Sequence, residues 1–501
     1  MLITLAAPAF AGTWYIENGD ITVKASGTEG KNKVSQGNNP EVEDTDTVIT
    51  NQKTDTASSN TVTIEAGNDK VEVTLKDVNI DASSRNKAAV SVTGSGNTTI
   101  KLDGDNALKS DTYRSGIYGS GSLTISGGEN DSLTAQGGSG ANGISSSGSL
   151  TISGGTVTAN GDDGGHGISS SGSLTISGGS TVTANGGNGT ISGGDGICSN
   201  GGVTISGGST VTANGGNGGT ISGGEGIRSG GGLTVSDGTV TAKGGNGDSK
   251  DSYGGDGIRS GGVVTISGNT VNAAGGYGGK VGGYGICSFD RVAISGGTVE
   301  AAGGNGSTGG GSGIYSSVID LSGSLELTAK AGSPNGKALS RAGSELELDT
   351  IKDKLGPGAK VTATDANGDS KQVSIPRPVE PEEPVIPEES SSSSDGGSAA
   401  PSAPASSLPG LIVTDKSGAV ISYTSTQSGN TLTVCVGRFT ASLRASLSAL
   451  RQLRAEGIET ITFQTILCST TLSVDELLAM GGEDAEAVLT HRFTDSSLTV
   501  G

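Results

Sequence analysis

Two columns of chemically active side chains flank a Gly-Ile pair that recurs along the middle of the chain. The first column precedes the pair and includes Asp195, Glu225 and Asp256, and the second follows it and includes Arg228 and Arg259. Three carboxylates that gather can bind Ca²⁺, which takes oxygen ligands. Paired carboxylates can also act as the acid and base of glycosidic cleavage. The pattern favours a third interpretation, a surface charge ladder that the arginines neutralise.

The full columns show how regularly these positions recur. The first column is Ser115, Asn142, His166, Asp195, Glu225, Asp256, Tyr284 and Ser312, and the second is Tyr118, Ser145, Ser169, Cys198, Arg228, Arg259, Cys287 and Tyr315. A polysaccharide lyase would use Arg228 or Arg259 as the base beside a Ca²⁺-binding carboxylate cluster. Active sites usually break local sequence rules, whereas these residues keep the register of the repeat. We expect His166 to be a turn residue and His491 a strand residue.

A second array consists of threonine pairs on either side of a recurring valine. Its members are Thr156, Thr158, Thr181, Thr183, Thr210, Thr212, Thr239 and Thr241. A flat face of paired threonines can order water and bind ice, or it can contact a glycan. Threonine also suits any solvent-facing strand through its β-propensity and cross-strand hydrogen bonds, and we favour this structural role.

The elements that must position these side chains are short strands. The Ile after Gly falls at residues 117, 144, 168, 197, 227, 258, 286 and 314, so the period is 24 to 31 residues. Each repeat holds three apolar strand segments separated by glycine-rich turns. Such a unit cannot bury its apolar face alone, and stacking of successive units supplies the core. We predict an all-β fold, a right-handed parallel β-helix (solenoid) with capped ends, followed by a linker and a small α+β domain.

Composition agrees with a repeat fold and excludes several partners. The chain has 501 residues with 91 glycines, only 3% aromatic residues and a net charge of −20. Nucleic-acid binding and attachment to anionic membranes need basic patches, and none is visible. Neutral glycans, cations and protein surfaces remain as partners.

The chain divides into four predicted parts. Residues 1–11 end in Ala-Phe-Ala and are typical of the end of a signal peptide. Residues 12–374 form the β-helix, the Pro/Glu/Ser-rich stretch 375–410 is a linker, and 411–501 form the α+β domain. No later stretch is long and apolar enough to be transmembrane.

In the last part, leucines at 443, 447, 450 and 453 have helical spacing, and Gly457 is placed to end that helix. Residues 461–463 are predicted as a strand, and Ser473 begins a capping box for a second helix that ends near Gly481. Cys435 and Cys468 either form a disulfide or remain two free thiols.

The repeated Leu-Thr-Ile-Ser-Gly-Gly and Thr-Val-Thr-Ala-Asn-Gly-Gly units, and the run 71–108 before them, resemble a family of secreted β-helix proteins. These are repeat proteins of Gram-positive bacteria, described as carbohydrate-binding-domain-containing surface proteins. The resemblance covers roughly residues 60–350 and implies carbohydrate binding outside the cell. Similar coils occur in adhesins, autotransporter passengers and polysaccharide lyases.

We therefore predict a secreted or cell-surface, adhesin-like binding or structural protein whose partner is a glycan or a protein surface. We expect no enzymatic activity and no organic cofactor, and Ca²⁺ at Asp195, Glu225 and Asp256 is the cation to consider. The alternative is a polysaccharide lyase or glycoside hydrolase that uses the same three carboxylates. Ice binding by the threonine array is a minor alternative.

Overall fold

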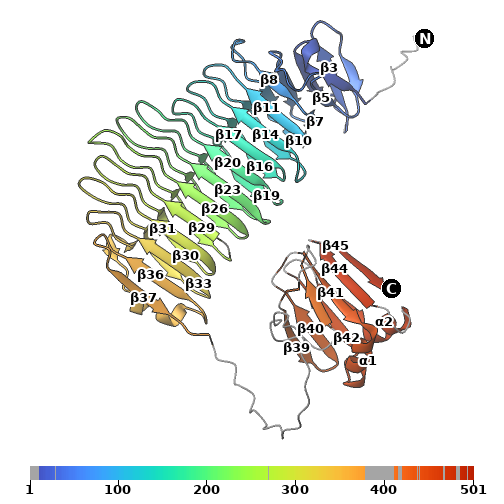
Figure 1. The fold of residues 1–501 in the computed structure, drawn as a ribbon. Coiled ribbons are helices and arrows are strands. Elements are labelled where there is room, and N and C mark those ends of the chain that lie inside the picture. The colour runs from blue at the N-terminus through green and yellow to red at the C-terminus, as the bar shows by residue number, and fades with distance from the viewer. Residues whose placement is uncertain are drawn as a thin grey trace, which may run out of the picture. The chain divides into compact units, whose positions relative to one another are not determined.

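A computed structural model describes residues 11–377 except 29 and 269, and residues 411–500 except 416–419, 422, 437, 439, 466–468, 481–485 and 493–494. The chain forms two compact units, Met1–Glu382 and Glu383–Gly501 (Figure 1). Most of the expected signal segment and of the expected linker lies outside the described residues. No helix in the described part of the chain is long and apolar enough to cross a membrane.

The first unit is a parallel β-solenoid of about 13 turns. Its strands stack into three faces, and within each face neighbouring strands come from successive turns (Figure 1). The first face consists of β2 (Ile21–Ala25), β6 (Val62–Gly67), β9 (Val90–Gly94), β12 (Ile117–Gly119), β15 (Ile144–Ser146), β18 (Ile168–Ser170), β21 (Ile197–Ser199), β24 (Ile227–Ser229), β27 (Ile258–Ser260), β30 (Ile286–Ile294), β32 (Ile314–Leu321) and β34 (Leu339–Arg341).

The other two faces have the same parallel pairing. The second consists of β1 (Thr13–Tyr15), β5 (Val48–Thr50), β7 (Lys70–Lys76), β10 (Asn97–Asp103), β13 (Leu123–Ser126), β16 (Leu150–Ser153), β19 (Leu174–Ser177), β22 (Val203–Ile205), β25 (Leu233–Val235), β28 (Val264–Ile266) and the later parts of β30 and β32. The third consists of β8 (Asn79–Asp81), β11 (Asp105–Lys109), β14 (Ser132–Gln136), β17 (Thr156–Asn160), β20 (Thr181–Asn185), β23 (Ser209–Asn214), β26 (Gly238–Lys243), β29 (Thr270–Ala274), β31 (Gly297–Ala302), β33 (Leu325–Lys330) and β36 (Lys360–Thr364).

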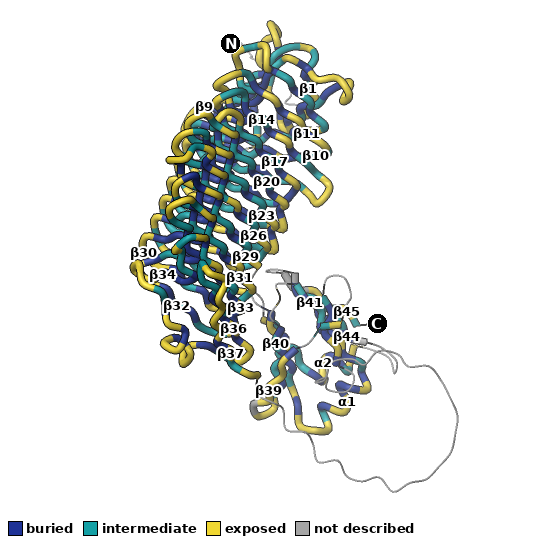
Figure 2. The backbone as a smooth tube through the Cα atoms, turned by 60° about the vertical axis from the view of Figure 1, so that its left-hand side comes forward, coloured by how far each residue is buried: buried dark blue, intermediate teal, exposed yellow. Residues whose placement is uncertain are grey.

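The core consists of like residues stacked from turn to turn. Ile144 pairs in register with Ile168, and Val157 pairs with Val182. All four are buried, and Figure 2 shows buried segments continuing through successive coils. Because alternate residues of a strand point inward, an apolar segment such as Leu150–Ser153 places two side chains in this core. The predicted β-helix is confirmed.

A row of buried serines lies at the ends of the first-face strands, and this row was not predicted from the sequence. The hydroxyl of Ser199 donates to the carbonyl of Gly172 in the preceding coil at 2.9 Å, and that of Ser229 donates to Gly201 at 3.1 Å. Ser146, Ser170, Ser260 and Ser288 make the same contact one coil back. The small hydroxyl fits where the chain turns, and the hydrogen bond offsets its burial.

The glycine-rich loops that project from one edge of the solenoid form a hydrogen-bonded layer (Figure 1). The backbone N–H of Gly224 donates to Gly216 within its own coil, and Gly245 in the next coil donates to Gly224, both at 2.8 Å. A Cβ at Gly255 would overlap the carbonyl oxygen of Gly224. Glycine is therefore required at this position by backbone packing rather than by a positive φ.

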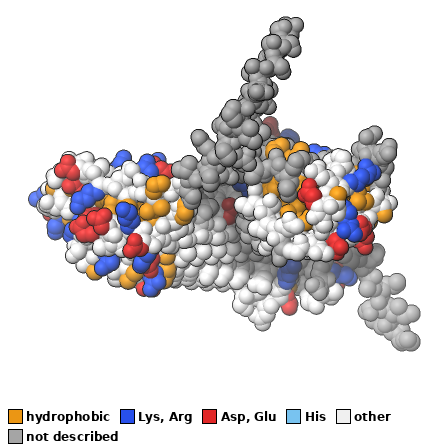
Figure 3. All heavy atoms as spheres, turned by 90° about the horizontal axis from the view of Figure 1, so that it is seen from below, with side chains coloured by type: hydrophobic (Ala, Val, Ile, Leu, Met, Phe, Trp, Pro, Cys, Tyr) orange, Lys and Arg blue, Asp and Glu red, His pale blue; other side chains and the backbone are white. Residues whose placement is uncertain are grey.

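Antiparallel strands cap both ends of the solenoid. At the N-terminal end β3 (Asn32–Gln36) pairs with β2, and β4 (Val42–Asp44) pairs with β3. At the other end β37 (Ser370–Ser374) pairs with β36, and β35 (Ser344–Glu345) pairs with β34. Caps of this kind protect the terminal coils from edge pairing. Figure 3 views the solenoid from its C-terminal end, where acidic and basic side chains are interspersed.

The chain does not continue as a strand after β35. Leu348 begins a 3₁₀ turn, η2 (Leu348–Thr350). A second such turn, η3 (Lys352–Lys354), follows. Leu346 and Leu348 are nevertheless buried in the core, so these two apolar residues pack there without forming a strand.

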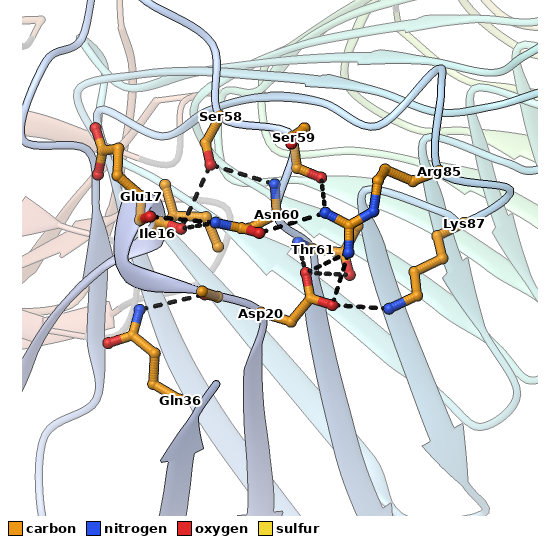
Figure 4. A network of polar contacts seen from close by, with 11 residues as sticks. Ile16, Glu17, Asp20, Gln36, Ser58, Ser59, Asn60, Thr61, Arg85 and Lys87 are labelled. Atoms are coloured by element: carbon orange, nitrogen blue, oxygen red, sulfur yellow. Dashed lines mark hydrogen bonds and ion pairs between the residues drawn. The ribbon is translucent and has the colours of Figure 1, made fainter. Parts of the chain in front are cut away.

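A polar network joins the N-terminal cap to the first coils (Figure 4). Asp20, which follows the 3₁₀ turn η1 (Ile16–Asn18), pairs with Lys87 at 2.8 Å and with Arg85 at 3.1 Å. Its Oδ1 also accepts the backbone N–H of Thr61 at 2.9 Å. Burial alone would raise the pKa of Asp20, but the hydrogen bonds and the two cations outweigh it and lower that pKa.

The second unit contains two four-stranded sheets and two helices. One sheet has the order β38 (Leu411–Thr414), β41 (Thr440–Ser446), β44 (Glu486–Arg492), β45 (Asp495–Val500), and the other β39 (Thr424–Ser428), β40 (Thr431–Cys435), β42 (Thr460–Gln464), β43 (Ser469–Ser473). The helices are α1 (Leu447–Ala455) and α2 (Val474–Met480).

The predicted first helix starts later than its leucine spacing indicated. Leu443 lies in β41, and α1 begins at Leu447 after the N-cap Ser446. Gly457 follows the helix with a φ of 91°, as its predicted role requires. The backbone N–H of Glu476 lies 3.4 Å from the Ser473 hydroxyl at the start of α2. Gly481 and Cys468 lie outside the described residues.

Candidate functional site

The structure aligns both predicted columns along the first face. Tyr118 pairs in register with Ser145, and Cys198 pairs with Arg228, which pairs with Arg259. The first column stacks beside it, because each glycine of a Gly-Ile pair donates its N–H to the column residue of the next coil. The face therefore presents two adjacent rows of side chains.

The carboxylates of the first column take part in the backbone hydrogen bonding of the fold. Oδ1 of Asp195 accepts the N–H of Glu225 at 2.8 Å, and Oδ1 of Asp256 accepts the N–H of Tyr284 at 2.7 Å. Asn142 and His166 act in the same way toward the next residue of the column, at 2.8 and 2.9 Å. Each side chain thus replaces a backbone acceptor for the coil stacked on it.

These groups lie beneath the surface rather than on it. Asp195 and Asp256 are 3% and 5% exposed. The guanidinium of Arg259 reaches Asp256 at 2.9 Å and Glu225 at 3.9 Å, and that of Arg228 lies 3.9 Å from Asp195. The arginines therefore lie beside the carboxylates. Asp195 and Asp256 are buried, however, so the predicted row of charges does not lie on the surface.

Burial strongly shifts the pKa values of the ionisable side chains in this column. Burial, together with the neighbouring Asp195, raises the pKa of Glu225 to about 8. Burial also raises the pKa of Asp256 to about 6, against the opposing effect of the Tyr284 N–H and Arg259. Burial lowers the pKa of His166, which favours a neutral imidazole.

A groove of about 690 Å³ opens on the same face, closer to the N-terminal end. Two exposed tyrosines line it, Tyr113 with 78% and Tyr118 with 41% of its surface accessible. Asn86, Arg114 and Asn142 line it as well. The groove thus combines two aromatic rings with amide and guanidinium donors in a mostly polar lining.

The loops that carry the groove are held in place by specific contacts. Tyr113 has a φ of 59° and Asn86 a φ of 52°, both in the left-handed region. The Asp111 carboxylate accepts the N–H of Asn86 at 2.6 Å and the N–H of Thr112 at 2.7 Å. The ring of Tyr113 lies against Gly140 in the next coil, where a Cβ would approach ring carbons at 2.8 Å. Non-glycine residues in this backbone region often mark functional sites.

This pair of tyrosines was not predicted as a site. Tyr118 belongs to the second column of the repeat, and Tyr113 lies in the turn before it. The available signal was local: the segment Asp111-Thr-Tyr-Arg-Ser-Gly-Ile-Tyr carries two tyrosines in a chain with 3% aromatic residues. Their meeting at one groove depends on how the loop folds back onto its strand.

The remaining predicted residues lie elsewhere. The threonine pairs form in-register ladders on the third face, where Thr156, Thr181, Thr210 and Thr239 are exposed and Thr158, Thr183, Thr212 and Thr241 half-buried. Tyr284 stacks on Tyr315 with ring centroids 4.9 Å apart. His491 lies in β44, as predicted, and is fully buried.

Comparison with known proteins identifies one family. No curated protein and no solved structure matches the chain. A family model described as carbohydrate-binding domain-containing protein matches residues 53–310, a range that contains the tyrosine groove and the buried ladder. The chain therefore belongs to the family of carbohydrate-binding domain-containing proteins.

Proposed function

We propose that this protein binds a glycan without turning it over, and that the groove of Tyr113 and Tyr118 is the binding site. The observation that carries the proposal is the pair of exposed tyrosines at one groove within the family region. An aromatic ring offers a flat apolar surface to the C–H face of a sugar. The amides and Arg114 beside it supply hydrogen-bond donors for hydroxyl or carboxylate groups.

Preorganisation of the groove supports the same role. The backbone N–H of Asn86 donates a hydrogen bond to the Asp111 carboxylate, and the ring of Tyr113 lies against Gly140. Side chains that are already ordered lose less conformational entropy when a ligand arrives.

The burial of the carboxylates argues for binding rather than cleavage. An acid and a base of a glycosidase must flank the scissile bond, whereas Asp195 and Asp256 are almost inaccessible and hold backbone N–H groups.

The test is a glycan array on the purified chain, read for both retained ligand and released products. We expect Tyr118→Ala and Tyr113→Ala each to abolish most binding, and Tyr277→Ala to bind like the parent. Tyr277 is a matched control because it is 49% exposed and does not line the groove. Unchanged binding by both groove variants would refute the assignment.

Polysaccharide cleavage is the second candidate, because raised carboxyl pKa values cluster at catalytic sites. It predicts product release from the parent and none from Asp256→Asn. Released products would replace the binding proposal with this one.

We further propose that the protein acts outside the cell as an adhesin-like rod. Its support is the glycan-binding family and the stacked solenoid architecture. Antibody labelling of intact cells of the source organism should detect the solenoid. Labelling only after lysis would contradict this location.

A further inference from the structure

Three different metal-binding side chains converge where two neighbouring coils meet on the first face. His166 and Asp195 are consecutive members of the first column, and Cys198 stands in the second column beside Asp195. One ligand atom from each lies within 4.8 Å of the other two. Nδ1 of His166 is 3.5 Å from Oδ2 of Asp195, a separation that two ligands of one small ion can have.

Asp195 is the buried centre of this cluster. Its side chain is 4% exposed, and its Oδ2 lies 3.5 Å from Nδ1 of His166 and 3.9 Å from Arg228. The carboxyl group of Glu225 and the thiol of Cys198 hydrogen-bond to Asp195 in their protonated forms. A cation bound here would take the place of such a proton and pair with the buried carboxylate.

From these observations we infer that His166, Asp195 and Cys198 bind a single Zn²⁺ ion. Nitrogen, oxygen and thiolate sulfur together form a donor set that Zn²⁺ accepts in tetrahedral geometry. Ca²⁺ takes oxygen ligands only, so this set differs from the predicted calcium site of Asp195, Glu225 and Asp256. The three protein ligands leave one position for water.

The ligands must change state when the ion binds. Burial raises the pKa of the Cys198 thiol to about 12, so the metal-free thiol is protonated, and ligation releases that proton to solvent. Nδ1 of His166 accepts the backbone N–H of Asp195 at 2.9 Å, so an ion that takes Nδ1 replaces this hydrogen bond. Because ligation of Cys198 releases a proton, binding weakens in acid.

The chain contains its own control for the cysteine. Cys287 occupies the same column and is buried, whereas Cys198 is half-buried, but the residue before the Gly-Ile of Cys287 is Tyr284 instead of a carboxylate. The carboxylate one coil back, Asp256, is already paired with Arg259 at 2.9 Å. Cys287 therefore lacks the mixed ligand set that surrounds Cys198.

The experiment is a titration of the reduced full chain with Co²⁺, followed by displacement with Zn²⁺. We expect one equivalent of Co²⁺ to produce a thiolate-to-cobalt charge-transfer band that Zn²⁺ abolishes. Cys198→Ser should lose the band, His166→Ala should lose it or bind much more weakly, and Cys287→Ser should keep it. Zn²⁺ should also raise the Tm of the parent and of Cys287→Ser but not that of Cys198→Ser.

The opposite results are equally clear. A parent that develops no charge-transfer band, or a band that survives in Cys198→Ser, would overturn the inference. So would equal Co²⁺ affinity in the parent and His166→Ala. Glycan binding at the tyrosine groove is a separate property and should be the same in all four proteins.

Discussion

Oδ1 of Asp195 accepts a hydrogen bond of 2.8 Å from the backbone N–H of Glu225, its neighbour in the next coil. The contact fixes two carboxyl groups close together in a largely buried column, and the molecule keeps one of them neutral over much of the pH range. The Glu225 pKa of about 8 is the consequence of burial and of this neighbour.

Replacement of Glu225 by glutamine should make stability less dependent on pH. An acid whose pKa is raised by folding does not oppose folding below its unfolded pKa. Its ionisation then destabilises the fold increasingly between about pH 4.5 and 8, and maximally above that range. Glu225→Gln should therefore unfold at a higher urea concentration than the parent at pH 9, with a gain on the order of 2–4 kcal/mol, and with little gain at pH 4. Glu300→Gln, at an exposed position on the third face, should show no such trend.

Gly255→Ala should destabilise the solenoid because the new methyl group would overlap the carbonyl of Gly224. We expect the free energy of unfolding to fall by about 3 kcal/mol or more. Circular dichroism should show this as a lower thermal midpoint. Gly309→Ala is the matched loop control, because its nearest contacts would be the methyl groups of Val281 at 3.8 Å. Equal midpoints for the two variants would mean that the loop layer is not closely packed.

Ser229→Ala tests the buried serine row. It removes hydrogen bonds to the carbonyls of Gly201 and Gly232, at 3.1 and 2.9 Å, and should cost about 1 kcal/mol of unfolding free energy. Ser236→Ala, on an exposed position of the same repeat, should cost almost nothing. If both substitutions had the same small effect in urea unfolding, the row would contribute nothing to stability.

Asp20→Asn should loosen the N-terminal cap. The variant loses the charge that pairs with Arg85 and Lys87, and we expect a cost of about 1 kcal/mol at neutral pH. Because folding lowers the pKa of Asp20, this contribution is present above the ordinary value of 3.8 and disappears as the pH falls through the folded pKa. Faster amide hydrogen exchange in β2 and β6 at pH 7 would show it, with the exposed Asp55→Asn as the control. Unchanged exchange in these strands would contradict it.

The sequence by itself determined the coil architecture. Columns such as Ile144 over Ile168 are encoded by residue type at a regular interval, and burying them requires only that one coil stack on the next. Residue spacing was a poorer guide in the second unit, where tertiary packing decides which element a residue joins. Leu443 continues the leucine spacing of α1, but it lies in β41, where it packs in the core of the second unit.

Only the tertiary structure decided which side chains meet and how deeply they lie. The spacing of the first column predicted that Asp195 and Asp256 stack, but it did not predict that both are almost completely buried. Tyr113 and Tyr118 face one groove because the loop around Asp111 turns back through left-handed backbone. Strand periodicity follows from local chain geometry, whereas burial and side-chain encounters depend on loop packing between coils, which no single repeat encodes.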